Sequence, residues 1–143
     1  QSKGDILEIG FGMGICSDYI QAQGVNSHTI VDIHPQIIEK LKVWAEDKDN
    51  VIIVEGDWYS VELNNGAYDG IFIDTYGGEN WDKFKEFALS KAKSGANVSY
   101  FNAGWLENEY KFENISYEYV PANSPYDIPF WKDNMYPMPK VVI

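Results

Sequence analysis

The most constraining feature of the sequence is a short apolar run that leads directly into a cluster of glycines. Asp5 to Ile9 has the character of a buried strand, Gly10, Gly12 and Gly14 follow at alternate positions, and Ile15 to Gln23 has helical spacing. Glycines permit a tight turn and let a ligand approach the backbone at the start of a helix. The segment therefore predicts a strand, a glycine turn and a helix.

Strand-like and helix-like segments then alternate along the chain. Apolar runs predict further strands at His28 to Ile33, Val51 to Val54, Gly70 to Ile73 and Val98 to Phe101. Between them, apolar stripes predict one helix that begins at Pro35 and another over Trp81 to Ala88. Continuous apolar strands that alternate with helices are typical of a parallel sheet covered on both faces.

The last part of the chain has a different pattern. Apolar and polar residues alternate over Ile115 to Val120, a proline-rich loop spans Pro121 to Pro129, and Lys140 to Ile143 has the character of a final strand. Two strands joined by a loop suggest an antiparallel finish. We therefore expect an α/β fold with a Rossmann-like, doubly wound sheet of seven strands, mostly parallel with an antiparallel C-terminal strand.

Composition limits the partners and the chemistry. The 143 residues suit one domain, and 11 basic against 22 acidic residues give a net charge of -11, which counts against nucleic acid as a partner. Cys16 is the single cysteine, and with His28 and His34 it lacks the spacing of a zinc site, so we expect no disulfide and no metal. We interpret Cys16 as a packed residue and both histidines as surface or loop residues. Without a membrane span or signal peptide, we expect a cytoplasmic protein.

Candidate binding residues follow the predicted strands, where ligands bind in doubly wound sheets. Asp32 ends the second strand, 22 positions after Gly10, and a carboxylate there can accept hydrogen bonds from ribose hydroxyls. Asp57 and Asp74 come just after the third and fourth strands. Each residue also has a plain structural interpretation: the glycines as an ordinary turn, Asp32 as a helix cap before Pro35, and the other two aspartates as surface turn residues.

The glycine spacing discriminates between cofactors. A nicotinamide site requires G-x-G-x-x-G or a small residue in the last place, and the frame that starts at Gly10 puts Ile15 there. The alternate glycines instead fit a cofactor without a pyrophosphate.

At this point the sequence resembles the class I S-adenosylmethionine (SAM) methyltransferases and, more narrowly, the guanidinoacetate N-methyltransferase family and its arginine δ-N-methyltransferase relatives. The resemblance spans nearly the whole chain and keeps the family's order. It is carried by the segments Gly10 to Gly14, Glu55 to Trp58, Tyr68 to Tyr76, Tyr100 to Asn102 and Met135 to Pro137.

The resemblance implies a role for each matching residue, with SAM as cofactor, S-adenosylhomocysteine (SAH) as product and no metal. The methionine part would be held by Glu8, Gly10, Gly12 and Gly14, the ribose by Asp32, and the adenine by Ile33, Asp57 and Trp58. Asp74 would be the catalytic carboxylate on the acceptor side. The remaining substrate-binding residues would be Thr75, Tyr76, Asn102, Ala103 and Gly104.

The implied reaction is methyl transfer to a guanidino nitrogen of a small molecule or of arginine. A guanidinium nitrogen is a poor nucleophile because its lone pair is delocalised, and a carboxylate can concentrate the positive charge on the other nitrogens or take the departing proton. The family also uses a second carboxylate from a segment upstream of its first strand, and we expect this single domain of residues 1–143 to lack that segment.

Two alternatives belong to other functional classes. A SAM- or SAH-binding module without catalysis, which works through a partner or the missing segment, is favoured by the expected absence of the upstream lid. A nicotinamide-dependent oxidoreductase is the weaker alternative because of Ile15.

Overall fold

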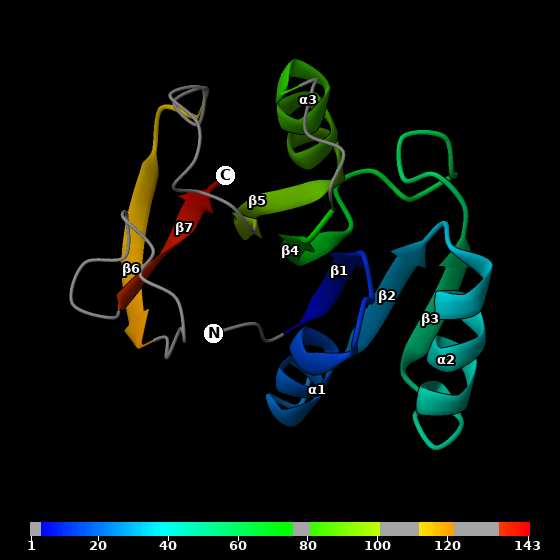
Figure 1. Cartoon of the computed structure of the whole chain (residues 1–143). Coiled ribbons are helices and arrows are strands. Elements are labelled where there is room, and N and C mark those ends of the chain that lie inside the picture. The colour runs from blue at the N-terminus through cyan, green and yellow to red at the C-terminus, as the bar shows by residue number, and fades with distance from the viewer. Residues whose placement is uncertain (1–3, 76–80, 101–111, 122–134) are drawn as a thin grey trace.

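The computed structural model describes residues 4–75, 81–100, 112–121 and 135–143, and these residues form one seven-stranded sheet (Figure 1). The strands are β1 (Asp5–Ile9), β2 (Ser27–Asp32), β3 (Val51–Glu55), β4 (Tyr68–Ile73), β5 (Ala92–Tyr100), β6 (Ile115–Pro121) and β7 (Met135–Val142). Their order is β3-β2-β1-β4-β5-β7-β6. Neighbours from β3 to β5 are parallel, and β7 runs antiparallel to both β5 and β6. The predicted fold is therefore confirmed.

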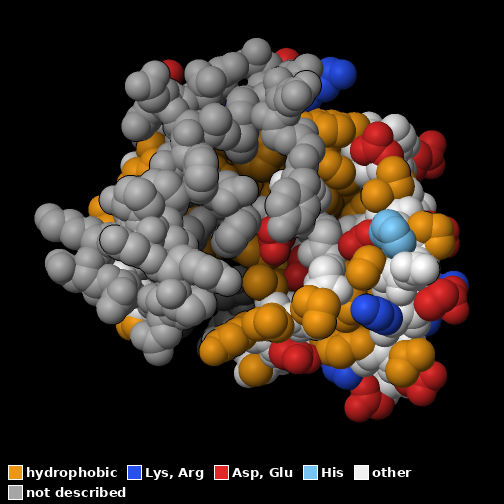
Figure 2. Space-filling model, in the orientation of Figure 1, with side chains coloured by type: hydrophobic (Ala, Val, Ile, Leu, Met, Phe, Trp, Pro, Cys, Tyr) orange, Lys and Arg blue, Asp and Glu red, His pale blue; other side chains and the backbone are white. Residues whose placement is uncertain are grey.

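Three helices lie among the described residues: α1 (Ile15–Ala22), α2 (Pro35–Ala45) and α3 (Trp81–Lys91). Pro35 is the first residue of α2, where its missing N–H costs no helical hydrogen bond. None of the described helices is both long and apolar enough to cross a membrane. On the face shown in Figure 2, Asp and Glu side chains lie among exposed hydrophobic ones, with a few Lys side chains between them.

The two faces of the sheet are covered by different helices. Ile30 and Val31 are consecutive in β2, so their side chains point to opposite faces. Ile30 packs with Ile38 and Leu41 of α2, whereas Val31 belongs to the cluster around α3. The helices on both faces explain why the strands have continuous apolar runs instead of alternating ones.

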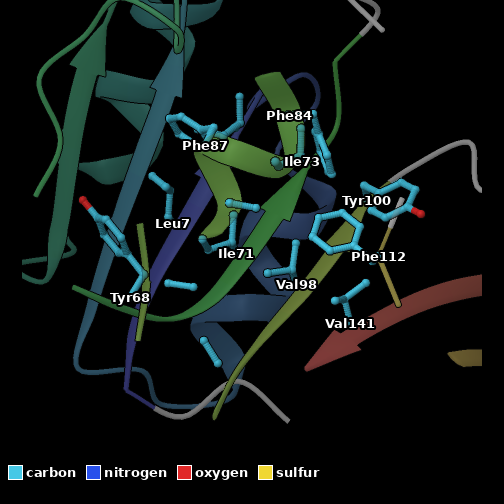
Figure 3. Packing of buried hydrophobic residues seen from close by; sticks show 14 of the residues in the cluster. Leu7, Tyr68, Ile71, Ile73, Phe84, Phe87, Val98, Tyr100, Phe112 and Val141 are labelled. Carbon is cyan, nitrogen blue, oxygen red and sulfur yellow. The ribbon is translucent and has the colours of Figure 1, made fainter. Parts of the chain in front are cut away.

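The larger cluster joins the centre of the sheet to α3 (Figure 3). Leu7 of β1 and Val98 of β5 are fully buried within it, and Phe84 and Phe87 project from α3. Phe84 makes edge-on contacts with Tyr100 and with Phe112, at centroid distances of 5.2 and 5.9 Å. This packing fixes the ends of β1 and β4, where the candidate residues lie.

Two strands are longer than the sequence indicated. β5 begins at Ala92 instead of Val98: Ala92 pairs with Tyr68 of β4, the register then shifts, and the exposed, positive-φ Gly95 lies in the irregular stretch before Asn97. β7 begins at Met135 instead of Lys140, although it contains two prolines. Among the described residues it pairs with β5 at Val141 and Val142, and the neighbour described for its proline-bearing half is β6. Proline is tolerated where one side of a strand makes no ladder bonds.

Candidate functional site

The carboxyl ends of β1 to β4 enclose a cavity of about 530 Å³, which we name the strand-end cavity. Most of the predicted site residues line it: Gly10, Gly12, Asp32, Ile33, Asp57, Trp58, Asp74 and Thr75. Glu8 and Gly14 do not line it. Four other predicted residues, Tyr76, Asn102, Ala103 and Gly104, lie outside the described part of the chain.

Backbone hydrogen bonds join the end of β1 and the glycine turn to β2 on one side and to the residue after β4 on the other. The amide of Gly10 donates to the carbonyl of Val31, and the amide of Asp74 donates to the carbonyl of Ile9, at 2.8 and 2.9 Å. Gly10 has a φ of 89°, and a Cβ there would overlap the main-chain oxygen of Asp74. Only glycine fits this position, both for its conformation and for the space available.

Gly14 has a different task, at the start of α1. It is the N-cap residue with a φ of 78°, and an added Cβ would lie 2.8 Å from the buried ring of Phe11. Gly14 therefore lets the turn close over Phe11, which is a packing role and not contact with the cavity.

Asp32 organises two backbone segments at once. Its Oδ2 accepts a hydrogen bond from the amide of Phe11 at 3.0 Å, and its Oδ1 accepts one from the amide of His34 at 2.9 Å. His34 is the N-cap residue of α2, so Asp32 orders the entry to that helix without being its cap. Each carboxylate oxygen keeps a further lone pair. The structural interpretation and the ribose interpretation are thus compatible.

Apolar groups form the walls of the strand-end cavity. Ile33 is 65% exposed, although it is a large aliphatic residue. Trp58 and Tyr59 are stacked with their centroids 3.6 Å apart, and the edge of Trp58 packs against Phe87 at 4.8 Å. These surfaces suit a flat aromatic ligand. Tyr59 was not predicted from the sequence, although an aromatic pair after Asp57 is a usable signal.

The charges in the strand-end cavity all have one sign. Asp32, Asp57 and Asp74 contribute three carboxyl groups, and no lysine or arginine is among the described residues that line it. Desolvation by partial burial raises the pKa of Asp74 above its usual value, and the charge of Glu8 raises it further. The arrangement favours a cationic ligand over a pyrophosphate.

Glu8 lies in β1, two residues before Gly10, and is fully buried. The hydroxyl of Ser17 donates to its Oε2 at 2.6 Å, and Nε2 of His28 lies 2.9 Å from the same oxygen. The prediction of a surface or loop position for His28 is wrong: it lies in β2, two residues before Ile30, and alternation turns both side chains inward. Ser17 and His28 were thus missed as neighbours of the predicted site.

Cys16 lies next to this group, at the second position of α1. Desolvation raises the pKa of its thiol to about 11, and the charges of Glu8 and Asp74 add to the effect. The raised pKa disfavours the thiolate, which is the reactive form of cysteine. This agrees with its interpretation as a packed residue.

Comparison with known proteins identifies the family. The model of the guanidinoacetate N-methyltransferase family matches residues 1–119. Protein arginine N-methyltransferase 2 of Kluyveromyces lactis is 35% identical over 106 residues, which cover 68% of this chain and 26% of the relative. The protein of the same name from Saccharomyces cerevisiae is 46% identical over 79 residues, or 50% of this chain and 19% of the relative.

Solved structures agree on the fold. A Thermoplasma acidophilum protein assigned as a methyltransferase superposes with a TM-score of 0.67 at 19% identity, covering 99% of this chain and 68% of that one. Phosphoethanolamine N-methyltransferase 1 of Haemonchus contortus, solved with phosphoethanolamine and SAH, has a TM-score of 0.60 at 17% identity, over 69% of this chain and 22% of that one.

This chain spans only about a quarter or less of the two curated relatives named above. Within that span, three observations point to the same kind of protein. They are the match to the family model, the order of the strands and the glycine turn after β1. The chain belongs to the guanidinoacetate N-methyltransferase family and has the fold of the class I SAM-dependent methyltransferases.

Proposed function

We propose that this chain binds SAM and transfers its methyl group to a guanidino nitrogen, either of a small molecule or of an arginine side chain. The observation that carries the proposal is the strand-end cavity itself. It combines a glycine turn, apolar walls and three aspartates without a described cation, which is a suitable environment for a cationic nucleoside cofactor and a cationic acceptor.

The residues present fit SAM. Gly10 and Gly12 leave the backbone accessible, Asp32 keeps lone pairs for the ribose hydroxyls, and Ile33 with Trp58 offers apolar surface to the adenine. When bound, SAM supplies an electrophilic methyl group on a positively charged sulfur. A nicotinamide dinucleotide would instead bring a negatively charged pyrophosphate into an acidic cavity, so family and electrostatics both disfavour the oxidoreductase alternative.

Asp74 is the residue that we assign to the acceptor. Its backbone is fixed by the hydrogen bond to Ile9, and its raised pKa makes the carboxylate a better proton acceptor than an ordinary aspartate. In the proposed reaction a guanidino nitrogen forms a bond to the methyl carbon, the bond from that carbon to sulfur breaks, and the nitrogen's proton passes to Asp74. Thr75 lines the cavity next to it and would shape the acceptor end.

The relatives support a guanidino acceptor by their names. The family model is named for guanidinoacetate, and the curated relatives are named as arginine methyltransferases. Both acceptors present a planar cation, which a carboxylate can bind through two parallel hydrogen bonds.

Calorimetric titration of this chain with SAM, SAH and NADH tests the cofactor. We expect SAM and SAH to bind and NADH not to bind. Methyl transfer from labelled SAM to guanidinoacetate, free arginine and arginine peptides then tests the reaction. Failure of SAM and SAH to bind would refute the proposal, and binding without transfer to any acceptor would favour the non-catalytic module instead.

A further inference from the structure

A buried carboxylate lies on the face of the sheet that α1 covers. Glu8 is fully buried, and its Oε2 is contacted from two sides, by the hydroxyl of Ser17 at 2.6 Å and by Nε2 of His28 at 2.9 Å. Its Oε1 is also buried and has no hydrogen-bond partner among the described residues. The side chain is therefore held through one oxygen only.

His28 lies between Glu8 and α1. The amide nitrogen of Gln21 is 3.2 Å from Nδ1 of the ring, and Nε2 lies 2.9 Å from Oε2 of Glu8. Among the described residues, no lysine or arginine pairs with Glu8. The carboxyl group of Glu8 therefore has polar neighbours but no lysine or arginine beside it.

The charge of Glu8 reaches the strand-end cavity. Glu8 pairs with Phe72 in the sheet, and Phe72 comes two residues before Asp74, so alternation directs Glu8 and Asp74 toward the same face. In agreement, the charge of Glu8 raises the pKa of both Asp74 and Cys16. Glu8 is buried, whereas Asp74 is exposed to solvent. Water and salt therefore screen the electrostatic field of the Glu8 carboxylate less than that of the Asp74 carboxylate.

We infer that Glu8, positioned by Ser17 and His28, makes this site prefer SAM to its product SAH. The inference rests on the proposed function. The two molecules share the adenosine and amino acid parts and differ by one methyl group and one positive charge at sulfur. A fixed, poorly screened negative charge stabilises the cationic form and gives the neutral product no such benefit. The same feature would promote exchange of SAH for SAM after each turnover.

The test is the ratio of two dissociation constants, that for SAH divided by that for SAM, measured by calorimetry on each variant. Glu8→Gln removes the charge and keeps the shape, and we expect it to lower the ratio by about tenfold, mainly through weaker SAM binding. Ser17→Ala keeps the charge but releases one contact on Oε2, and we expect a fall of roughly threefold. Glu39→Gln is the control, because Glu39 is 73% exposed on α2, and it should leave the ratio unchanged.

The ratio separates a charge effect from a folding effect, since both ligands bind the same folded fraction of a variant. If Glu8→Gln does not fold, Ser17→Ala still provides the test. The inference is overturned if both ligands weaken equally, or if the ratio stays constant in the variants that fold. Failure of the unaltered chain to bind either ligand would count against the proposed function instead.

Discussion

The main-chain amide of Phe11 donates a hydrogen bond to Oδ2 of Asp32 over 3.0 Å, so one carboxylate links the glycine turn after β1 to the end of β2. Its other oxygen accepts from His34. Asp32→Ala removes both acceptors, and we expect it to weaken SAM binding and to lower the free energy of unfolding, each by about 1 to 3 kcal/mol. Calorimetry and urea unfolding measure the two effects. Unchanged SAM affinity would contradict the ribose assignment.

Gly10 and Gly12 form a matched pair for testing the turn. Both have positive φ, 89° and 55°, but a Cβ at Gly10 would overlap the main chain of Asp74, whereas one at Gly12 would meet no atom within 4 Å. We expect Gly12→Ala to cost about 1 kcal/mol of stability from conformation alone, and Gly10→Ala roughly 3 kcal/mol or more. Denaturant unfolding of both variants checks the difference. Equal losses would mean that the backbone contact is unimportant.

Asp74→Asn should separate activity from stability. Loss of the proton acceptor is expected to reduce the methyl-transfer rate by about 10² to 10⁴-fold, with SAM affinity changed only a few-fold. Because the folded state raises the pKa of Asp74, ionisation at neutral pH disfavours folding. The amide variant should therefore melt at a higher temperature at pH 7, and this difference should vanish as the pH falls below the ordinary carboxyl value near 3.8. Undiminished transfer would refute the assignment.

Lys93 connects two strands at the opposite end of the sheet. Its ammonium lies 2.9 Å from Oδ2 of Asp5 and 2.7 Å from Oδ2 of Asp69. The hydrogen bonds that Lys93 donates lower the pKa of both carboxyl groups, and the same two bonds raise the pKa of Lys93. We expect Lys93→Met to lower the melting temperature at pH 7.

The pH dependence of that loss follows from the directions of the shifts. The carboxylate contribution is present above the ordinary value of 3.8 and disappears as the pH falls through the lowered values. The ammonium contribution is present below 10.5 and disappears as the pH rises through the raised value. Thermal melts across pH test this. Lys42→Met is the control, since Lys42 pairs with Glu39 on the exposed side of α2 and should show a smaller loss.

The sequence predicted the sheet because its central strands are covered on both faces and consequently show unbroken apolar runs. The sequence pattern did not predict the strand segments that lack an apolar run. The first half of β5 contains Lys93, Ser94 and Gly95, and β7 contains two prolines, so neither stretch resembles a strand until its partner strands are known.

The candidate site was predictable to the extent that its residues follow strands directly. Asp32, Asp57 and Asp74 could be placed together because carboxyl ends of parallel strands meet at one edge. The contacts of Glu8 with Ser17 and His28 could not be foreseen. They join residues from β1, α1 and β2 that no local pattern relates, and a polar side chain in a strand gives no sign of being buried.

The close approach of Gly10 to the main-chain oxygen of Asp74 bears on how the proposed site can acquire new substrates. In the proposed division of the site, the cofactor and acceptor halves meet through main-chain atoms, which no point substitution of a neighbouring side chain removes. Positions from Thr75 onward could then vary while the carboxylate that we propose as proton acceptor stays in register with the glycine turn. On this proposal, a single scaffold would serve acceptors as different in size as a free amino acid derivative and a protein side chain.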